Sequence, residues 1–487
     1  MSSLSDAIYM HSPVWLQQAA VAVWGYRWYW QRFGGRFPQY VREYLDRDRW
    51  TAEQFREYQT ERLRCVFEAA WRSPYYREAF AAANMTENMA PRESLARAPF
   101  LSKNTLRTRG DELLSTTRLP RGVSIFHTSG STGTPTKLYY SREFLRQQMA
   151  ILEARNYHYA GVTYCDRRFM CGVRKVCRFD QTKPPFWRYS PAENLAYASA
   201  YHLSPRFLPY YLEFLRRFRP QIVMGYPSAL STIAAYALEH DDLPAPARCI
   251  ITTSETVTDQ MREVMERAWQ CRLFDQYGCS EGCCFTSQCE YGRYHTHPDV
   301  GLIEILDTDG MPAAPGTIGE VVCTGLHNTL QPLIRYRIGD VARWAVDQTC
   351  PCGRHTPLLE GIDGRVEDMC CTPDGRQTLR FDTVFKGVAN VREAQVVQEK
   401  PDLFILRIVP TEGFGPSDAD VLRRNMLLHV SNVRVEVEIV ASIERSASGK
   451  FRAVVCRLTP EERNELLHGR SQHGEETAAK PTGRADS

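Results

Sequence analysis

The sequence lacks several features that would define the class of the protein at once. Its formal net charge is only +3 over 487 residues, so no charge excess indicates a nucleic-acid partner. The N-terminus has no basic start followed by an uninterrupted apolar run, so we expect no signal peptide and a cytoplasmic location. Its sixteen cysteines, in a chain of this length, do not indicate a small disulfide scaffold. We expect reduced thiols, some of them bound to a metal.

The sequence also lacks a hydrophobic run long enough to span a bilayer. The nearest candidate, "VWLQQAAVAVWGYRWYW" (residues 14–30), holds four of the nine tryptophans but is interrupted by Gln17, Gln18 and Arg27. It could lie at a membrane surface, where tryptophan is favoured. We favour an amphipathic helix packed on the body of the protein, because most apolar stripes belong to a core. The apolar positions at near-helical spacing are Trp15, Leu16, Ala19, Val23 and Trp24.

Strand-like and helix-like segments alternate in the middle of the chain. "QIVMGYPSALSTIAAYALEHDD" and "RCIITTSETVTDQMREVMERAW" each begin as an apolar strand and continue with helical spacing, and "CRLFDQYGCSEG" begins as another strand. We expect Thr258 to cap the second helix. This alternation predicts an α/β fold with a doubly wound parallel sheet. Ligands bind at the carboxyl ends of such strands, hence in the loops Gly225–Ser228, Thr253–Glu255 and Tyr277–Gly282.

The composition changes after about residue 365. There the pattern indicates a hairpin, a helix and a further strand, which form a small α+β domain. We expect an N-terminal helical segment (1–95), a large core domain (96–364), the small C-terminal domain (365–462) and a polar, disordered tail (463–487).

The stretch "FHTSGSTGTPTKLYY" (126–140) is a Gly/Ser/Thr loop that follows a strand-like segment. Its backbone N–H groups and hydroxyls, together with one lysine, have the chemistry that cradles phosphates. The loop does not fit G-x-x-x-x-G-K-[ST], so the protein is not a P-loop NTPase. The candidate phosphate-binding residues are Thr128, Ser129, Gly130, Ser131, Thr132, Gly133, Thr134 and Lys137.

Taken with four later segments, this loop resembles the superfamily of adenylate-forming enzymes, which includes acyl-CoA synthetases, adenylation domains and luciferases. The later segments occur in the family's order: "YGCSEG" (277–282), "RYRIGD" (335–340), "GRVED" (364–368) and "SASGK" (446–450). "GYPSAL", "TTSETVT" and "RFGGRFPQYVREYL" resemble the phenylacetate–CoA ligase-like branch and its capsule-biosynthesis relatives.

The resemblance implies that ATP activates a carboxylic acid as acyl-AMP, with release of pyrophosphate. It implies that Glu281 holds Mg²⁺, that Asp340 binds the ribose, and that the catalytic Lys450 reaches the carboxylate and the α-phosphate. Tyr277 would lie near the adenine, with Glu367 or Asp368 as the hinge between the domains. The remaining implied residues are Ser254, Glu255, Gly278, Ser280 and Arg365 at the nucleotide, and Tyr226 and Pro227 in the substrate pocket.

A second group of residues has the chemistry of a metal site. "QCEYGRYHTH" and "CPCGRH" supply Cys289, His295, Cys350 and Cys352, with His297 as a substitute. Cysteine and histidine are the ligands of tetrahedral Zn²⁺, and four protein ligands make a closed structural site. Some phenylacetate–CoA ligase-like proteins have a similar arrangement. We expect the zinc to pin two loops beside the nucleotide site.

Three functions remain open. The first is an AMP-forming carboxylate–CoA ligase. The second is an adenylating enzyme that passes its acyl group to an amine, an alcohol or a carrier-protein thiol. It gains weight because "MCCTPDGRQTLRF" stands where many CoA ligases have a Gly-Asn-Pro loop. The third is a non-catalytic relative, which the complete motif set disfavours. Tyr226 and the aromatic residues Phe186, Trp187 and Tyr189 hint at an apolar or aromatic acid.

Overall fold

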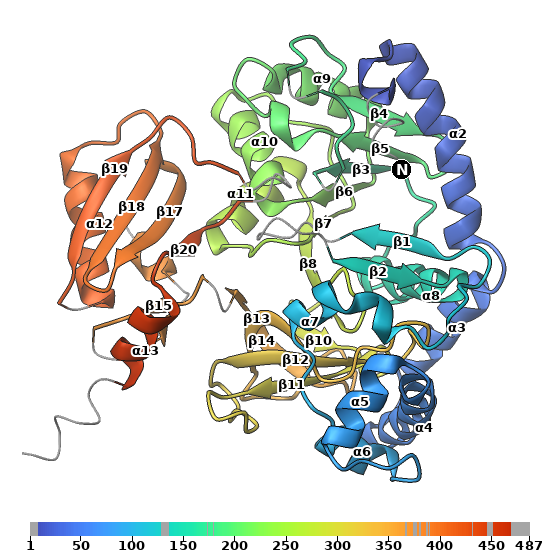
Figure 1. The fold of residues 1–487 in the computed structure, drawn as a ribbon. Coiled ribbons are helices and arrows are strands. Elements are labelled where there is room, and N and C mark those ends of the chain that lie inside the picture. The colour runs from blue at the N-terminus through green and yellow to red at the C-terminus, as the bar shows by residue number, and fades with distance from the viewer. Residues whose placement is uncertain are drawn as a thin grey trace, which may run out of the picture. The chain divides into compact units, whose positions relative to one another are not determined.

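The structure is a computed structural model of the 487-residue chain. It describes residues 8–127, 136–172, 174–178, 180–365, 368–373, 377–378, 381–385, 388, 390–430, 432–445 and 451–468. Two compact units divide the chain near residue 362, close to the boundary expected from the composition (Figure 1). The mixed α/β class predicted from the sequence is confirmed.

Helices open the first unit: α2 (Val14–Phe33), α3 (Phe37–Arg47), α4 (Ala52–Trp71), α5 (Pro74–Ala82), α6 (Pro91–Arg97) and α7 (Lys103–Thr108). A capping box between Thr51 and Gln54 begins α4, and each member satisfies a free backbone N–H of the other. The apolar face of α4, with Leu63 and Val66, packs into a core shared with Tyr336. The N-terminal helices therefore belong to the large unit.

A twelve-stranded sheet forms the centre of this unit, in the order β11-β12-β13-β14-β10-β9-β8-β7-β6-β3-β5-β4. Its parallel part runs from β5 to β8, with β4 antiparallel at the edge. These strands are β3 (Arg168–Cys171), β4 (Trp187–Ser190), β5 (Leu195–Ala198), β6 (Ile222–Gly225), β7 (Cys249–Thr252) and β8 (Arg272–Gly278). Three helices link them: α9 (Leu208–Phe218), α10 (Pro227–Glu239) and α11 (Asp259–Trp269).

The local predictions for this region are confirmed. Thr258 is the N-cap of α11, and its side chain accepts a hydrogen bond from Met261 N. The central strands are fully buried, as expected of a parallel sheet covered on both faces. One boundary differs: Tyr277 and Gly278 end β8, so the third loop begins at Cys279.

The rest of the sheet is antiparallel. It comprises β9 (Phe285–Gln288), β10 (Tyr294–Thr296), β11 (Gly301–Leu306), β12 (Gly319–Gly325), β13 (Tyr336–Trp344) and β14 (Leu358–Arg365). A separate hairpin pairs β1 (Ser124–His127) with β2 (Lys137–Tyr140). Helix α8 (Arg142–Leu152) follows and continues as one π-helical turn, η2 (Glu153–Tyr157).

The second unit contains the predicted hairpin, helix and strand. Strands β17 (Val391–Lys400) and β18 (Leu403–Pro410) form the hairpin, α12 (Pro416–His429) crosses over, and β19 (Arg434–Ile439) returns parallel to β18. With β20 (Val454–Cys456), these strands make a sheet in the order β19-β18-β17-β20. The short strands β15 (Cys370–Cys371) and β16 (Gln377–Thr378) pair with each other.

The prediction of a disordered tail from residue 463 is wrong for residues 463–468, and the rest of that segment lies outside the described residues. Helix α13 (Pro460–His468) continues past residue 463. At its start the backbone N–H of Thr459 donates to the Glu462 carboxylate, and the backbone N–H of Glu462 donates to the Thr459 hydroxyl. Leu466 packs against the core of the unit. Capping and one apolar contact therefore hold a segment whose composition alone indicates disorder.

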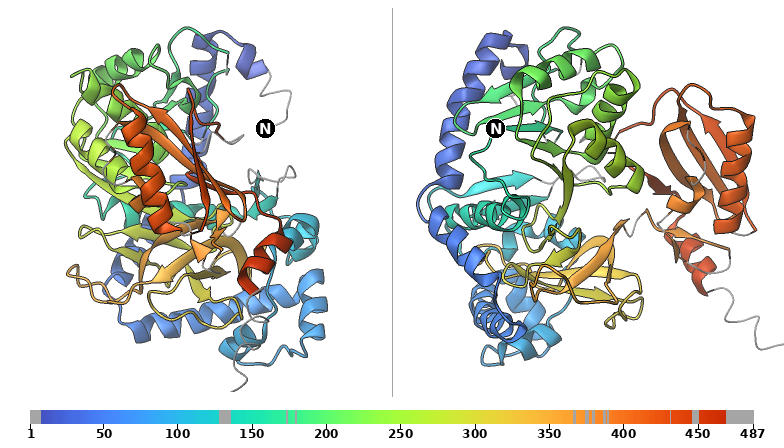
Figure 2. Two further views of the ribbon diagram at one scale, coloured as in Figure 1. Left: turned by 90° about the vertical axis from the view of Figure 1, so that its left-hand side faces the viewer. Right: turned by 180° about the vertical axis from the view of Figure 1, so that it is seen from behind.

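Helix α2 packs on the body as predicted, but with the opposite face. It lies along one side of the large unit, next to β4 and α8 (Figures 1 and 2). Its buried residues are Gln17 and Gly25, whereas Trp15 and Val23 are 71% and 72% exposed. The expectation that the apolar stripe faces a core is wrong. No described helix is long and apolar enough to cross a bilayer.

Candidate active site

The phosphate-loop candidate connects the strands of the β1–β2 hairpin. Thr128 to Thr134 lie outside the described residues. The strands that precede and follow them in the chain pair with His127 opposite Lys137. The Lys137 side chain is half exposed, and its ammonium lies 3.6 Å from a carboxylate oxygen of Asp111.

The hairpin packs directly on the second motif. The Tyr140 hydroxyl donates a hydrogen bond of 2.6 Å to the backbone carbonyl of Ser280. Gly282 adopts a φ of +67°, and a Cβ there would lie 2.7 Å from the Tyr140 hydroxyl oxygen, so this contact requires glycine. The phosphate-loop hairpin and the loop that carries Glu281 are thereby held together.

Two tyrosine–carboxylate pairs join the second and third motifs. The Tyr277 hydroxyl donates to Asp340 Oδ2 at 2.8 Å, and the Tyr336 hydroxyl donates to Glu281 Oε1 at 2.8 Å. Both carboxylates are buried. Burial, and then the neighbouring carboxylate, raises the pKa of each tyrosine above its ordinary value, so both phenols remain protonated donors.

The loops after β6 and β7 also meet. Glu255 Oε2 accepts a hydrogen bond of 3.0 Å from the backbone N–H of Ser228, in the first turn of α10. Ser254 has a φ of +73°, an uncommon conformation for a residue with a side chain. Tyr226 is buried and precedes Pro227 at the start of α10. The structure thus brings the two loops together through Glu255, at the first turn of the helix that follows Tyr226.

The hinge and lysine candidates are only partly described. Glu367 and Lys450 lie outside the described residues. Asp368 is buried and forms an ion pair with Arg452, two residues after Lys450. Arg365 ends β14. Within the second unit, the hinge segment is therefore tied to the strand that follows the lysine loop.

The four predicted zinc ligands converge. The sulfur atoms of Cys289 and Cys350 lie 3.6 Å apart, and Cys352 Sγ lies 3.3 Å from His295 Nε2. The ligand atoms of all four residues lie within 4.8 Å of one another. These separations fit a tetrahedral zinc, for which a Zn–S bond of about 2.3 Å places two sulfurs about 3.8 Å apart.

The surroundings of His295 suit a metal ligand. Burial, and then the nearby Arg354 guanidinium, lowers the pKa of His295 to about 4, so the imidazole is neutral at physiological pH. Its Nδ1 lies 2.8 Å from Thr356 Oγ1, an outer contact that fixes the ring orientation. His297, the predicted substitute, instead lies 2.9 Å from Ser287 Oγ and is not in the cluster.

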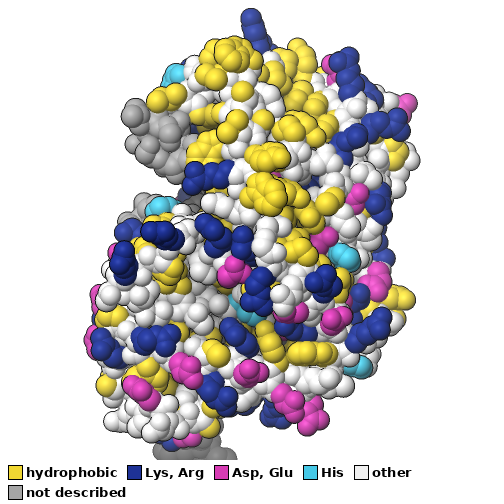
Figure 3. Space-filling view, turned by 90° about the vertical axis from the view of Figure 1, so that its right-hand side faces the viewer, with side chains coloured by type: hydrophobic (Ala, Val, Ile, Leu, Met, Phe, Trp, Pro, Cys, Tyr) yellow, Lys and Arg dark blue, Asp and Glu magenta, His cyan; other side chains and the backbone are white. Residues whose placement is uncertain are grey.

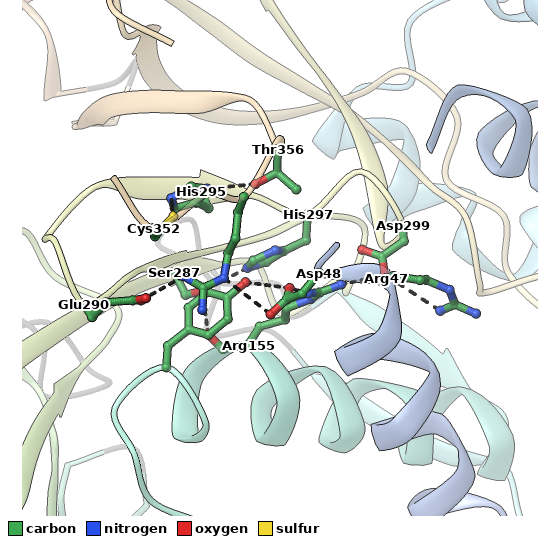
Figure 4. Close-up of polar contacts among 12 residues, drawn as sticks. Arg47, Asp48, Arg155, Ser287, Glu290, His295, His297, Asp299, Cys352 and Thr356 are labelled. Carbon is green, nitrogen blue, oxygen red and sulfur yellow. Dashed lines mark hydrogen bonds and ion pairs between the residues drawn. The ribbon is translucent and has the colours of Figure 1, made fainter. Parts of the chain in front are cut away.

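A buried ionic network adjoins the cluster (Figure 4). Arg155, which is fully buried, lies 3.0 Å from Asp299 and also pairs with Asp48. Arg354 bridges Asp48 and Glu290, the residue after Cys289. The cluster is thus linked by charge to the end of α3 and to the π-helical turn.

Sequence reasoning missed the partners of the motif residues. Tyr336 stands inside "RYRIGD", and Tyr140 follows the loop lysine, but neither had an assigned role. The aromatic residues that hinted at an aromatic substrate have packing partners within the fold instead. Phe186 is fully buried and stacks on His202, and Trp187 stacks on Phe214. These aromatic residues pack between β4 and α9.

Comparison with known proteins agrees with the motif set. Residues 102–330 match the family model "AMP-binding enzyme", and residues 372–457 match "CapK C-terminal domain". Protein CapK of Staphylococcus aureus is 27% identical over 93% of this chain and 99% of its own. Phenylacetate-coenzyme A ligase of Thermus thermophilus is 26% identical over 79% of this chain and 82% of its own.

The chain is similar to the adenylate-forming enzymes. Its relatives among them are CapK and phenylacetate-coenzyme A ligases, which agrees with the phenylacetate–CoA ligase-like resemblance of the sequence. A crystal structure of 2-hydroxyisobutyryl-CoA ligase in its postadenylation state has the same fold, with a TM-score of 0.65, 20% identity, and coverage of 88% of this chain and 94% of that one. The fold and the motif order of this chain therefore agree with those relatives.

Proposed function

We propose that the protein uses ATP to activate a carboxylic acid as acyl-AMP, releases pyrophosphate, and then transfers the acyl group to CoA as a thioester. One observation carries the proposal. The pairs Tyr277–Asp340 and Tyr336–Glu281 join two motifs that are distant in sequence, on the loop against which the phosphate-loop hairpin packs.

Each residue at this site has a definite task. The loop between β1 and β2 holds the terminal phosphates through its N–H groups and hydroxyls, with Lys137 at its edge. Asp340, oriented by Tyr277, accepts hydrogen bonds from the ribose hydroxyls. Glu281, oriented by Tyr336, ligates Mg²⁺, a hard ion that prefers carboxylate oxygen and that supplies charge neutralisation at the phosphates. Glu255 and Ser254 border the nucleotide from the neighbouring loops.

Lys450 has the decisive charge in the first half-reaction. The attacking carboxylate and the α-phosphate are both anions, so their approach needs a fixed cation. The lysine serves this step only, since thioester formation starts from acyl-AMP that already exists. Glu367 and Asp368 act as the hinge.

We also propose that Cys289, His295, Cys350 and Cys352 hold a structural zinc. A closed set of four protein ligands leaves no position for a substrate. The ion would tie the turn after β9 to the loop between β13 and β14, without a part in the reaction.

A second acceptor class has specific support. The C-terminal unit matches the CapK C-terminal domain, and residues 369–381 depart from the Gly-Asn-Pro pattern of many CoA ligases. An amine, an alcohol or a carrier-protein thiol could then take the place of CoA.

A pyrophosphate-release assay with a panel of acids, with and without CoA, tests the proposal. We expect release with one class of acid, and thioester product when CoA is present. Lys450→Ala should nearly abolish acyl-AMP formation and spare thioester formation from supplied acyl-AMP, whereas Lys400→Ala, at an exposed lysine that ends β17, should change neither. Pyrophosphate release without thioester would favour another acceptor. Equal loss of both half-reactions in Lys450→Ala would contradict the assigned role.

A further inference from the structure

The outward face of α2 is almost entirely apolar. Seven of its large apolar side chains are exposed, with Trp15 at 71%, Tyr26 at 64% and Trp30 at 61%. Five of them, Trp15, Leu16, Val23, Tyr26 and Trp30, fall within an arc of about 100° on a twenty-residue helix, which is about 30 Å long. Figure 3 shows apolar side chains gathered on the upper part of the face along which α2 runs. The seven are Val14, Trp15, Leu16, Val23, Trp24, Tyr26 and Trp30.

Polar contacts fix this orientation. Gln17 accepts a hydrogen bond of 3.0 Å from the buried Arg188. Gln18 binds both the backbone N–H and the carbonyl of Tyr189. Arg32 lies 3.1 Å from Glu193.

The helix backbone also approaches the edge strand too closely to rotate. A Cβ at Gly25 would lie 2.0 Å from Ser190 Oγ, on β4. Turning the exposed tryptophans inward would break these polar contacts. It would also place a bulky side chain where only Gly25 fits against β4.

The charge on α2 itself has one sign. Residues 8–33 contain no Asp or Glu, and they contain two arginines. Arg32 points to the body, whereas Arg27 is exposed and lies over the Trp24 ring. Lys175 and Lys183 are exposed in the segment that Tyr9 and Gln17 contact, and the acidic residue of that segment, Asp180, is paired with Arg178. The unpaired charge of α2 at the apolar stripe is therefore positive, which favours an anionic partner.

We propose that the exposed face of α2 binds the surface of an anionic lipid bilayer, with the helix lying in the plane of the membrane. Tryptophan and tyrosine side chains are favoured at the membrane–water interface, and basic residues beside an apolar face add attraction to anionic lipids. A second copy of the chain fits less well. It would bring two Arg27 side chains onto one apolar seam, without an acidic residue from either helix to pair with them.

Flotation of the full-length protein with vesicles tests the proposal. Phosphatidylcholine vesicles with phosphatidylserine should carry the protein upward, and vesicles without phosphatidylserine should carry less. The triple variant Trp15→Gln, Val23→Gln, Trp30→Gln should partition at least about tenfold more weakly. It should keep the wild-type melting temperature and activity, because these side chains are exposed. Leu428→Gln, at an exposed leucine of α12, is the matched control and should bind as the wild type does.

A charge variant separates the two contributions to binding. Arg27→Glu should reduce binding to the anionic vesicles about tenfold or more and leave the weak binding to neutral vesicles unchanged. Failure of the wild type to float with either vesicle would overturn the proposal. So would a wild-type dimer in light scattering that the triple variant converts to a monomer, because the face would then belong to a second copy.

Discussion

The two ends of the β8–β9 hairpin carry different chemistry. Near its turn, Glu281 accepts a hydrogen bond from Tyr336; beyond the other end, Cys289 lies 3.6 Å from Cys350. The four-residue strand β9, about 13 Å long, lies between them in the chain. Carboxylates such as Glu281 can bind a substrate or its metal ion reversibly. Four coordinating side chains, by contrast, fill every position of a tetrahedral metal and leave none for a substrate. Neighbouring sites on one hairpin can thus serve separate purposes, the first in the reaction and the second in stability.

The strongest test removes the carboxylate that we propose binds the ribose. Asp340→Ala should lower kcat/KM for ATP about a thousandfold, which corresponds to ~4 kcal/mol of transition-state stabilisation, and should keep the full zinc content. Pyrophosphate release measures the first and metal analysis the second. Glu304→Ala, which removes a carboxylate paired with Arg335 in the same sheet, should remain active. Wild-type kcat/KM in Asp340→Ala would remove this residue from the site.

The second test removes a residue of the cysteine–histidine cluster and should lower zinc content and stability while activity is kept. The purified protein should contain about one zinc per chain, and Cys352→Ser should lose it together with ~3 kcal/mol of unfolding free energy, because metal binding is coupled to folding. The folded variant should keep its kcat at low temperature. Cys165→Ser, at an exposed cysteine outside the cluster, serves as control. A zinc-free wild type of full stability would disprove the metal site.

A third buried carboxylate, Glu153, tests whether a buried acid outside the motifs affects stability without affecting activity. Burial raises the pKa of Glu153 from 4.5 to about 7, so the folded state binds its proton more tightly than the unfolded state does. The contribution of this group to stability is complete below pH 4.5 and is lost as the pH rises through 7, at a cost of roughly 2–3 kcal/mol.

Glu153→Gln should therefore raise the melting temperature at pH 8, leave it nearly unchanged at pH 4, and leave activity as it was. Thermal unfolding across this pH range measures the effect. A parallel loss of kcat would show that Glu153 belongs to the reaction after all.

The smallest effect is expected at a positioning residue. Tyr336→Phe removes only the hydroxyl that holds Glu281, so kcat/KM should fall about fivefold, equivalent to ~1 kcal/mol. The loss should be greatest at low Mg²⁺ if Glu281 ligates the ion. Tyr210→Phe, at an exposed tyrosine, is the control. Lower stability with an unchanged Mg²⁺ dependence would make the Tyr336 hydroxyl purely structural.

Much of the local structure could be predicted because its causes are local. Thr258 caps α11 through its own side chain, and the alternating pattern on both sides of Pro401 produces the β17–β18 hairpin. Four cysteine and histidine residues could be grouped as zinc-ligand candidates because few other side chains bind zinc, and the structure brings these four together. Helix α13 was not predicted because the segment has a polar composition, which indicates disorder. The helix is held by one capping pair and by the contact of Leu466 with the core, and neither is evident from the sequence alone.

The orientation of α2 could not be predicted for a different reason. Helical periodicity identifies the residues that share a face, but not the face that meets the rest of the protein. The apolar side usually faces the core, because burial removes it from water. Here Arg188, Ser190 and Glu193 offer polar partners and a close approach at Gly25, so Gln17, Gln18 and Arg32 face inward together with Trp28 and Phe33.

The sequence by itself determined the kinds of chemistry present: a phosphate-type loop, two motif acids, a C-terminal lysine and a zinc-type ligand set, in an order that indicates the family. The tertiary structure alone decided which of them meet. Tyr277 lies 63 residues from Asp340, and Cys289 lies 61 residues from Cys350. Contacts at such separations depend on how the strands assemble into one sheet, and no local propensity encodes that assembly.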